Sequence, residues 1–135
     1  MALQLAFCVL DKRYTLTQLP PGAPFPGNAN GSFMAMIASR EGISIMSEEA
    51  AAAHEHRTRA GFRCLEVSGT FDIESVGVLA AAVEPLAHSG ISVFAYSTWE
   101  RDYMLVQEKD LDRAIHALRE AGHSIAKASL EDGPS

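Results

Sequence analysis

The stretch "GISVFAYSTWERDYMLVQEKDLDRAIHALREAGH", residues 90–123, decides the fold of the second half of the chain. Apolar and polar residues alternate over 91–97 and again over 102–107, which predicts two neighbouring strands. A helix follows, and Gly122 is placed to end it. Its apolar face has the i, i+3, i+4, i+7 spacing and consists of Leu111, Ala114, Ile115 and Leu118. The stretch therefore predicts two strands and a helix, in that order.

The sequence on either side repeats the same pattern. A strand is expected over 63–68 and another over 124–128, with a helix between the first of them and residue 90. Together these elements have the order βαββαβ, which predicts a ferredoxin-like module: a four-stranded antiparallel sheet with both helices on one face. The expected apolar face of the first helix consists of Val76, Leu79, Ala80, Val83, Leu86 and Ala87.

The ends of that first helix also carry recognisable residues. Asp72 or Ser75 is suited to cap its free amides, and Gly90 is suited to end it. Pro85 sits in its last turn, where the missing N–H removes one backbone bond and loosens the helix.

The first half of the chain contains strands without a convincing helix. Two strands are expected over 3–10 and 14–19, joined by a charged turn, and a proline-rich and glycine-rich loop follows over 20–31. A hairpin is expected from strands near 33–39 and 43–47, and residues 48–61 are expected to form a short helical turn and a linker. The prediction is an α+β chain with a strand-rich module over 1–60 and a βαββαβ module over 61–130.

Composition limits the classes of partner. The chain has 135 residues, 47% of them hydrophobic, and a net charge of −6, so it offers no basic stripe for nucleic acid. Its longest apolar region, 76–96, is interrupted by charged residues and proline, and its N-terminus lacks the basic region of a signal peptide. We expect a cytoplasmic protein with no membrane span. The cysteines and the histidine pair at 54–56 lack metal-site spacing, so we expect free thiols, no metal and no cofactor.

The connection between the two strands of the opening stretch is unusual. A tight turn needs only Gly, Asn, Asp or Pro, whereas "STWER" at 97–101 carries hydroxyls, an indole and both signs of charge. One interpretation is that these groups hold a ligand. The other is that Thr98 and Asp102 cap the turn while Trp99 fills a gap between the two modules.

Three segments resemble a known family. "VSGTFDIESVGVLAAAVEPLAHSGISVF", residues 67–94, resembles the ACT domain. Residues 90–123 are closer still to the CASTOR-type tandem ACT subfamily, which includes an arginine sensor. "SFMAMIASREGISIMSEE", residues 32–49, is similar to the degenerate N-terminal ACT module of that subfamily.

The resemblance implies a regulatory protein that binds an amino acid between two ACT units and catalyses nothing. It places the ligand against the turn Gly69, Thr70, Phe71 and Asp72 of one unit and the strand Ile91, Ser92 and Val93 of the other. The subfamily also uses the connection that is represented here by Ser97, Thr98, Trp99 and Asp102. Trp99 is bulkier than the family's Phe or Tyr, so the ligand's size is expected to differ. With one well-formed ACT module, a complete site requires a second chain, which implies a homodimer.

Elementary chemistry is compatible with this placement. The carboxylate of an amino acid is stabilised by backbone amides at a helix N-terminus, here 71–74, and its ammonium by Thr98 and Asp102. Trp99 would supply an apolar wall or a cation–π partner. Two other classes stay open: a ligand-free module that dimerises or docks on a partner enzyme, and an enzyme. The enzyme is disfavoured because the sequence has no nucleophile elbow, phosphate loop or HExxH motif.

Overall fold

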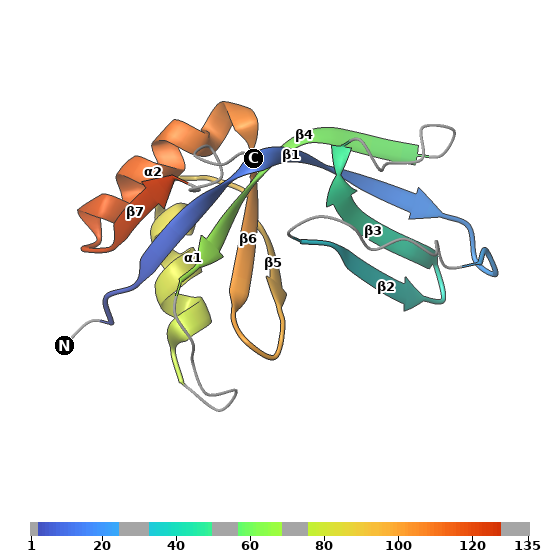
Figure 1. Cartoon of the computed structure of the whole chain (residues 1–135), viewed down its shortest axis with the longest axis horizontal. Coiled ribbons are helices and arrows are strands. Elements are labelled where there is room, and N and C mark those ends of the chain that lie inside the picture. Colours follow the sequence, from blue (N-terminus) through green and yellow to red (C-terminus); the bar gives the residue numbers. More distant parts are fainter. Residues whose placement is uncertain (1–2, 25–32, 50–56, 69–75, 128–135) are drawn as a thin grey trace. The chain divides into compact units, whose positions relative to one another are not determined.

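The computed structural model describes residues 3–24, 33–49, 57–68 and 76–127 (Figure 1). These residues combine strands with two α-helices, so the predicted α+β content is confirmed. In chain order the elements are β1 (Ala6–Leu19), β2 (Ala35–Ser39), β3 (Gly42–Glu48), β4 (Arg57–Val67), α1 (Val78–His88), β5 (Phe94–Ser97), β6 (Asp102–Gln107), a short 3₁₀ turn η2 (Glu108–Asp110), α2 (Leu111–Glu120) and β7 (Ser124–Lys127).

The chain divides into two compact units. The helical unit consists of residues 1–11 and 63–135, and the strand unit consists of residues 12–62. Two long strands, β1 and β4, contribute residues to both units. Residues 1–11, which include the start of β1, thus group with residues 63–135.

The sheet of the helical unit has the strand order β7-β1-β4-β6-β5. The first part of β1 runs parallel to β7, with Ala6 opposite Ser124 and Val9 opposite Lys127. At the end of β4, the Ser68 N–H donates to the Ala6 carbonyl at 2.8 Å. The N-terminal strand thus lies between the first and last strands of the βαββαβ series. This sheet therefore has five strands instead of the predicted four, and one of its pairings is parallel.

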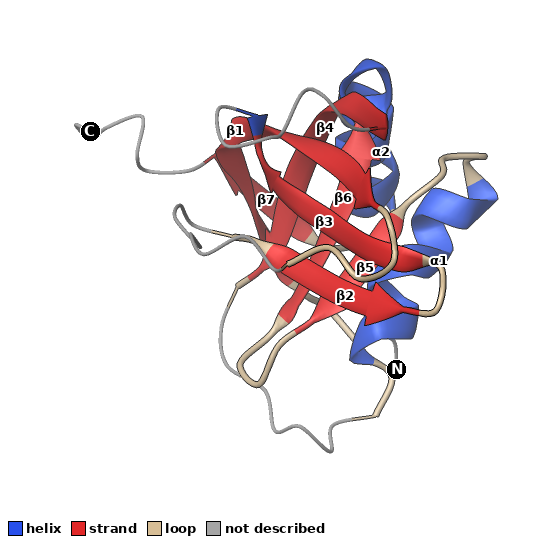
Figure 2. Ribbon diagram, turned by 90° about the vertical axis from the view of Figure 1, so that its right-hand side faces the viewer, coloured by secondary structure: helices blue, strands red, loops and turns tan. Residues whose placement is uncertain are grey.

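Both helices of this unit lie on one face of its sheet (Figure 2). Alternate residues of β1, β4 and β6 point to that face, because side chains in a strand alternate between the two sides. With α1 and α2 they form a single apolar core that includes Phe7, Val9, Leu65, Val67, Ala82, Leu86, Met104, Val106, Ala114 and Leu118. The predicted apolar face of α2 is largely confirmed: Leu111, Ala114 and Leu118 are buried, and Ile115 packs against the core.

The predicted apolar face of α1 is confirmed only for Leu86, which is buried, and Val83, which packs against the core. The buried residues of this helix are Val78, Ala82 and Leu86, whereas Val76 is 93% exposed and Leu79 40% exposed. The helix is apolar on nearly every side, "VLAAAVEPLA", so periodicity alone did not select one face. Its end is as predicted, because Gly90 follows with φ +71° and the Ile91 N–H reaches back to the Leu86 carbonyl at 2.9 Å.

The N-cap position of α1 is occupied by a glycine. The helix starts after Gly77, which makes no side-chain capping bond. Asp72 and Ser75, the expected caps, lie outside the described residues.

Two predictions for the first half are also wrong. Residues 11–13 do not form a turn. These three charged residues are exposed and belong to β1, which continues through them. Residues 57–61 belong to β4 and are not a linker. The expected hairpin is confirmed as β2 and β3, which pair antiparallel with Ser39 opposite Gly42.

The strand unit has a small core of its own. Leu19, Ile43 and Ile45 form it, and Met34 and Met36 pack against them. Tyr14, which is fully buried, meets Phe33 edge to face at 5.9 Å between ring centroids.

None of the helices in the described part of the chain has the length and apolar character needed to span a membrane.

Candidate ligand-binding site

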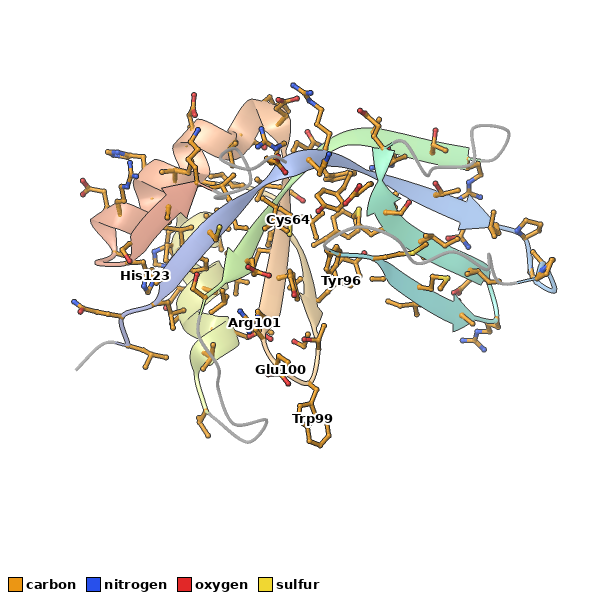
Figure 3. All side chains as sticks on the ribbon, in the orientation of Figure 1. Cys64, Tyr96, Trp99, Glu100, Arg101 and His123 are labelled. Atoms are coloured by element: carbon orange, nitrogen blue, oxygen red, sulfur yellow. The ribbon has the colours of Figure 1, made fainter. Side chains whose placement is uncertain are left out.

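The predicted clamp is the connection between β5 and β6, at the tip of a hairpin in the helical unit (Figure 3). Ser97 and Asp102 are the last cross-strand pair before the turn. The Ser97 hydroxyl donates to Asp102 Oδ1 at 2.6 Å, a short distance typical of a hydrogen bond to a carboxylate. The structure thus brings two predicted site residues together and fixes the position of the carboxylate.

Thr98 organises the turn that follows. Its hydroxyl donates to the Arg101 carbonyl at 3.1 Å and accepts the N–H groups of Glu100 and Arg101, both at 3.2 Å. Its own N–H donates to the same Arg101 carbonyl at 2.9 Å. These contacts explain how the chain reverses without Gly, Asn or Pro, because a threonine side chain replaces backbone partners. The turn-capping half of the second interpretation therefore describes the Thr98 hydroxyl correctly.

Trp99 lies in the turn between β5 and β6. It is 76% exposed and projects from the tip of the hairpin (Figure 3). The indole is accessible to a ligand or a partner. An exposed tryptophan beside a fixed carboxylate is a combination that a binding site uses for an apolar wall and a cation partner.

The other predicted site residues differ from one another in how exposed they are. Ile91 is 4% exposed and belongs to the core, and Val93 packs against the core, while Ser92 is exposed. All three precede β5, which begins at Phe94, so the expected strand over 91–97 is shorter than predicted. Gly69, Thr70, Phe71 and Asp72 lie outside the described residues.

Two tyrosines next to the turn were not among the predicted site residues. Tyr96 and Tyr103 form the cross-strand pair adjacent to Ser97 and Asp102. Burial raises the pKa of Tyr96, and burial followed by the Glu66 carboxylate raises the pKa of Tyr103. Both phenols therefore keep their protons at neutral pH and can donate hydrogen bonds. The alternation of the sequence predicts that both tyrosines lie in strands, but it gives no sign that they are neighbours or partly buried. Sequence reasoning therefore had no basis for selecting them.

The segment that leads into β5 is held by α2. Arg113 Nη1 donates to the Ser89 carbonyl at 2.9 Å, and Arg113 Nη2 donates to Asp110 Oδ1 at 3.0 Å. Hydrogen bonding by Arg113, and then by Lys109, lowers the pKa of Asp110 in spite of its burial. This arrangement links the end of α1 to the start of α2 and so supports residues 90–93.

Within the described ranges, no three side chains of the types His, Cys, Asp and Glu are grouped so that they could hold an ion. The thiol of Cys64 is fully buried, and burial raises its pKa, which disfavours the thiolate.

Comparison with known proteins agrees with the fold. The family model described as an ACT domain matches residues 57–120, which include β4, α1, β5, β6 and α2. Residues 57–120 are therefore similar to an ACT domain. No curated protein matches the chain significantly.

Solved structures of similar fold cover nearly the whole chain. An Agrobacterium tumefaciens protein is 25% identical with a TM-score of 0.87, covering 94% of this chain and 96% of its own. A Vibrio cholerae protein of unknown function is 21% identical with a TM-score of 0.66, covering 87% and 90%. The regulatory subunit of aspartate kinase from Thermus thermophilus is 10% identical with a TM-score of 0.64, covering 90% and 99%. The last two are likenesses of fold alone.

Proposed function

We propose that this ACT-family chain is a regulatory protein that binds a small molecule, an amino acid, at a site that includes the β5–β6 turn. The observation that carries the proposal is the placement of Asp102. Its carboxylate is fixed by Ser97 at the mouth of a turn whose tip exposes Trp99. A carboxylate in that position suits an ammonium group, and the indole suits the rest of a small cationic or zwitterionic ligand.

The finer features of the proposal come from the resemblance to the tandem ACT subfamily. The strand unit would be the degenerate N-terminal module, and the ligand would lie where two ACT units pack together. The turn Gly69 to Asp72 of one unit would then face Ile91, Ser92 and Val93 of the other. Two copies of the chain would complete the site, and the protein would act in the cytoplasm without catalysing a reaction.

A panel of the twenty amino acids in a thermal shift assay tests this function. A ligand that binds only the folded state raises the melting temperature, by an amount that grows with its concentration above Kd. We expect one amino acid, or a few of related chemistry, to stabilise the protein at millimolar concentration while the others do not. A flat response across the panel would contradict an amino-acid effector.

A second function is favoured by a specific observation. The Thr98 hydroxyl is already occupied by the turn, and Trp99 is exposed in the way that aromatic anchors of protein interfaces are before binding. A ligand-free module that docks on a partner enzyme through Trp99 is therefore the alternative. It predicts no response to amino acids and loss of partner binding on Trp99→Ala.

A further inference from the structure

The last described strand of the helical unit, β7, has one edge, here called its open edge, with no partner among the described strands. Among the described strands, β7 pairs with β1 alone. The Ser124 N–H donates to the Leu5 carbonyl at 3.0 Å, so the backbone of Ser124 faces β1. Since successive residues of a strand direct their backbone groups to opposite sides, Ile125 and Lys127 direct theirs away from β1. A side chain reaches one of these groups, because Arg119 Nη2 lies 3.4 Å from the Ile125 carbonyl.

A groove accompanies this edge. It lies between α2 and β7 and encloses about 300 Å³. Ile115 and Ile125, both half-buried, contribute apolar surface to it, and exposed Arg119 and Lys127 contribute positive charge. The combination of outward backbone groups and an apolar groove is what strand addition requires: the backbone supplies affinity, and the groove accepts alternate side chains.

The charge of the groove contrasts with that of the chain. The whole chain carries −6, yet the groove has Arg119 and Lys127 against a single carboxylate, Asp112. Its fourth ionisable residue, His116, lies 3.9 Å from Glu120 through Nε2. An approaching segment with acidic side chains is attracted by Arg119 and Lys127, whereas the net charge of −6 repels it from the chain as a whole, which favours binding at this groove.

We propose that the open edge of β7 binds an extended, acidic peptide segment of a partner protein as an added strand. The segment's main chain pairs with the outward groups of Ile125 and Lys127. One of its apolar side chains enters the groove beside Ile115, and its acidic side chains meet Arg119 and Lys127. This site is separate from the β5–β6 turn and does not depend on the proposed effector.

Fluorescence anisotropy on the full chain tests the proposal. The probe is a labelled peptide of about eight residues with the repeat Val-Ser-Glu-Ser, which places Val and Glu on the same face of the added strand and spans β7. The matched control peptide has Lys in place of Glu. We expect the acidic peptide to bind more tightly by about tenfold or more, and the double variant Arg119→Glu/Lys127→Glu to reverse that preference. Equal binding of the two peptides would overturn the proposal.

Two controls separate strand addition from a general charge effect. Lys12→Glu/Arg40→Glu makes the same charge change at exposed residues outside the groove, and we expect it to alter the affinity less than about threefold. Peptides N-methylated at every Ser, or instead at every Val and Glu, lose the N–H groups of one edge, so we expect one of the two patterns to abolish binding. Unimpaired binding of both methylated peptides would overturn the proposal. So would light scattering in which Arg119→Glu/Lys127→Glu converts a dimer to a monomer, because a second copy would then occupy the edge.

Discussion

At the scale of single residues, His123 connects two segments that are far apart in sequence. The ring is buried and meets Phe7 edge to face at 5.6 Å between centroids. Nδ1 accepts the Leu5 N–H at 2.9 Å, so the proton of the neutral ring lies on Nε2, which is 3.1 Å from the Ala81 carbonyl. That carbonyl lacks its usual helical donor, because the residue four positions on is Pro85. His123 therefore compensates for the proline in α1.

This account predicts a measurable coupling between His123 and Pro85. His123→Ala leaves a buried N–H and a carbonyl unpaired and should lower the free energy of unfolding by about 2 to 4 kcal/mol. In a Pro85→Ala background, the Ala81 carbonyl regains a helical N–H, so the same change should cost about 1 kcal/mol less. Urea denaturation of the four proteins of this cycle measures the difference. Strict additivity would show that the Ala81 contact is not a stabilising bond.

Asp110 gives a prediction about pH. Because Arg113 and Lys109 hold the pKa of the folded carboxyl below its ordinary value, ionised Asp110 stabilises the folded state at neutral pH. That contribution is complete above the ordinary pKa, about 3.9, and is lost as the pH falls through the lower folded pKa. Asp110→Asn should therefore unfold more easily than wild type at pH 6, and the gap should shrink as the pH falls below about 4.

Denaturation midpoints of both proteins between pH 6 and pH 2.5 measure this gap. Asp112→Asn removes an exposed carboxylate two residues away, in α2, and is the control; it should show little gap at any pH in this range. A gap for Asp110→Asn that stays constant with pH would mean that the ion pair does not contribute.

At the scale of elements, the hairpin β2–β3 depends on one glycine. Gly42 has φ +131°, and a Cβ at this position would overlap the Leu19 carbonyl oxygen. Gly42→Ala combines a strained backbone with a collision against main-chain atoms, so we expect a loss of about 2 to 4 kcal/mol in the free energy of unfolding.

Gly61 in β4 is the matched control for that substitution. It also has positive φ, +85°, but no atom lies within 4 Å of the Cβ that Ala would add. Gly61→Ala should therefore cost only the backbone term, about 1 to 2 kcal/mol. Thermal denaturation of both variants gives the comparison, and equal losses would contradict the collision with Leu19.

Local periodicity predicted the elements whose buried side is determined by their own residues. It failed for elements whose buried side or strand partner is determined by contacts with distant parts of the chain. β6, α2 and the β2–β3 hairpin follow their patterns, because alternation or one apolar stripe determines the buried side. The face of α1 could not be predicted, because Leu79 and Ala82 are similarly apolar and only packing distinguishes them. The parallel pairing of β7 with the start of β1 joins residues more than a hundred positions apart, for which the sequence contains no local signal.

The candidate site was predictable to a similar degree. The composition of "STWERD" correctly marked a connection built by side chains, and the structure pairs Ser97 with Asp102. One of the two interpretations gave Thr98 its role within the turn. The exposure of Trp99 depends on the exact path of the hairpin, which composition does not give. The same is true of Ile91, which is an apolar residue at a strand start in the sequence and a core residue in the structure.

At the scale of the whole molecule, the proposed site requires a second copy of the chain. A C2 pair is the simplest assembly that presents the same turn twice. Light scattering of the full chain at micromolar concentration should therefore give about twice the monomer mass of 14.5 kDa. If the effector lies between the copies, its addition should shift the equilibrium further towards the dimer. A mass of 14.5 kDa both with and without the stabilising amino acid would contradict the shared site.

The central claim is that the carboxylate of Asp102 binds the ammonium of an amino acid. Calorimetric titration of the best ligand from the amino-acid panel into wild type and Asp102→Asn tests it most directly. Asparagine keeps an oxygen that can accept the Ser97 hydroxyl, so the turn is retained while the charge is removed, and Asp11→Asn is the control at an exposed carboxylate elsewhere. We expect Asp102→Asn to weaken binding roughly 30-fold or more with an unchanged melting temperature, and Asp11→Asn to change nothing. Equal affinity of wild type and Asp102→Asn would contradict the claim.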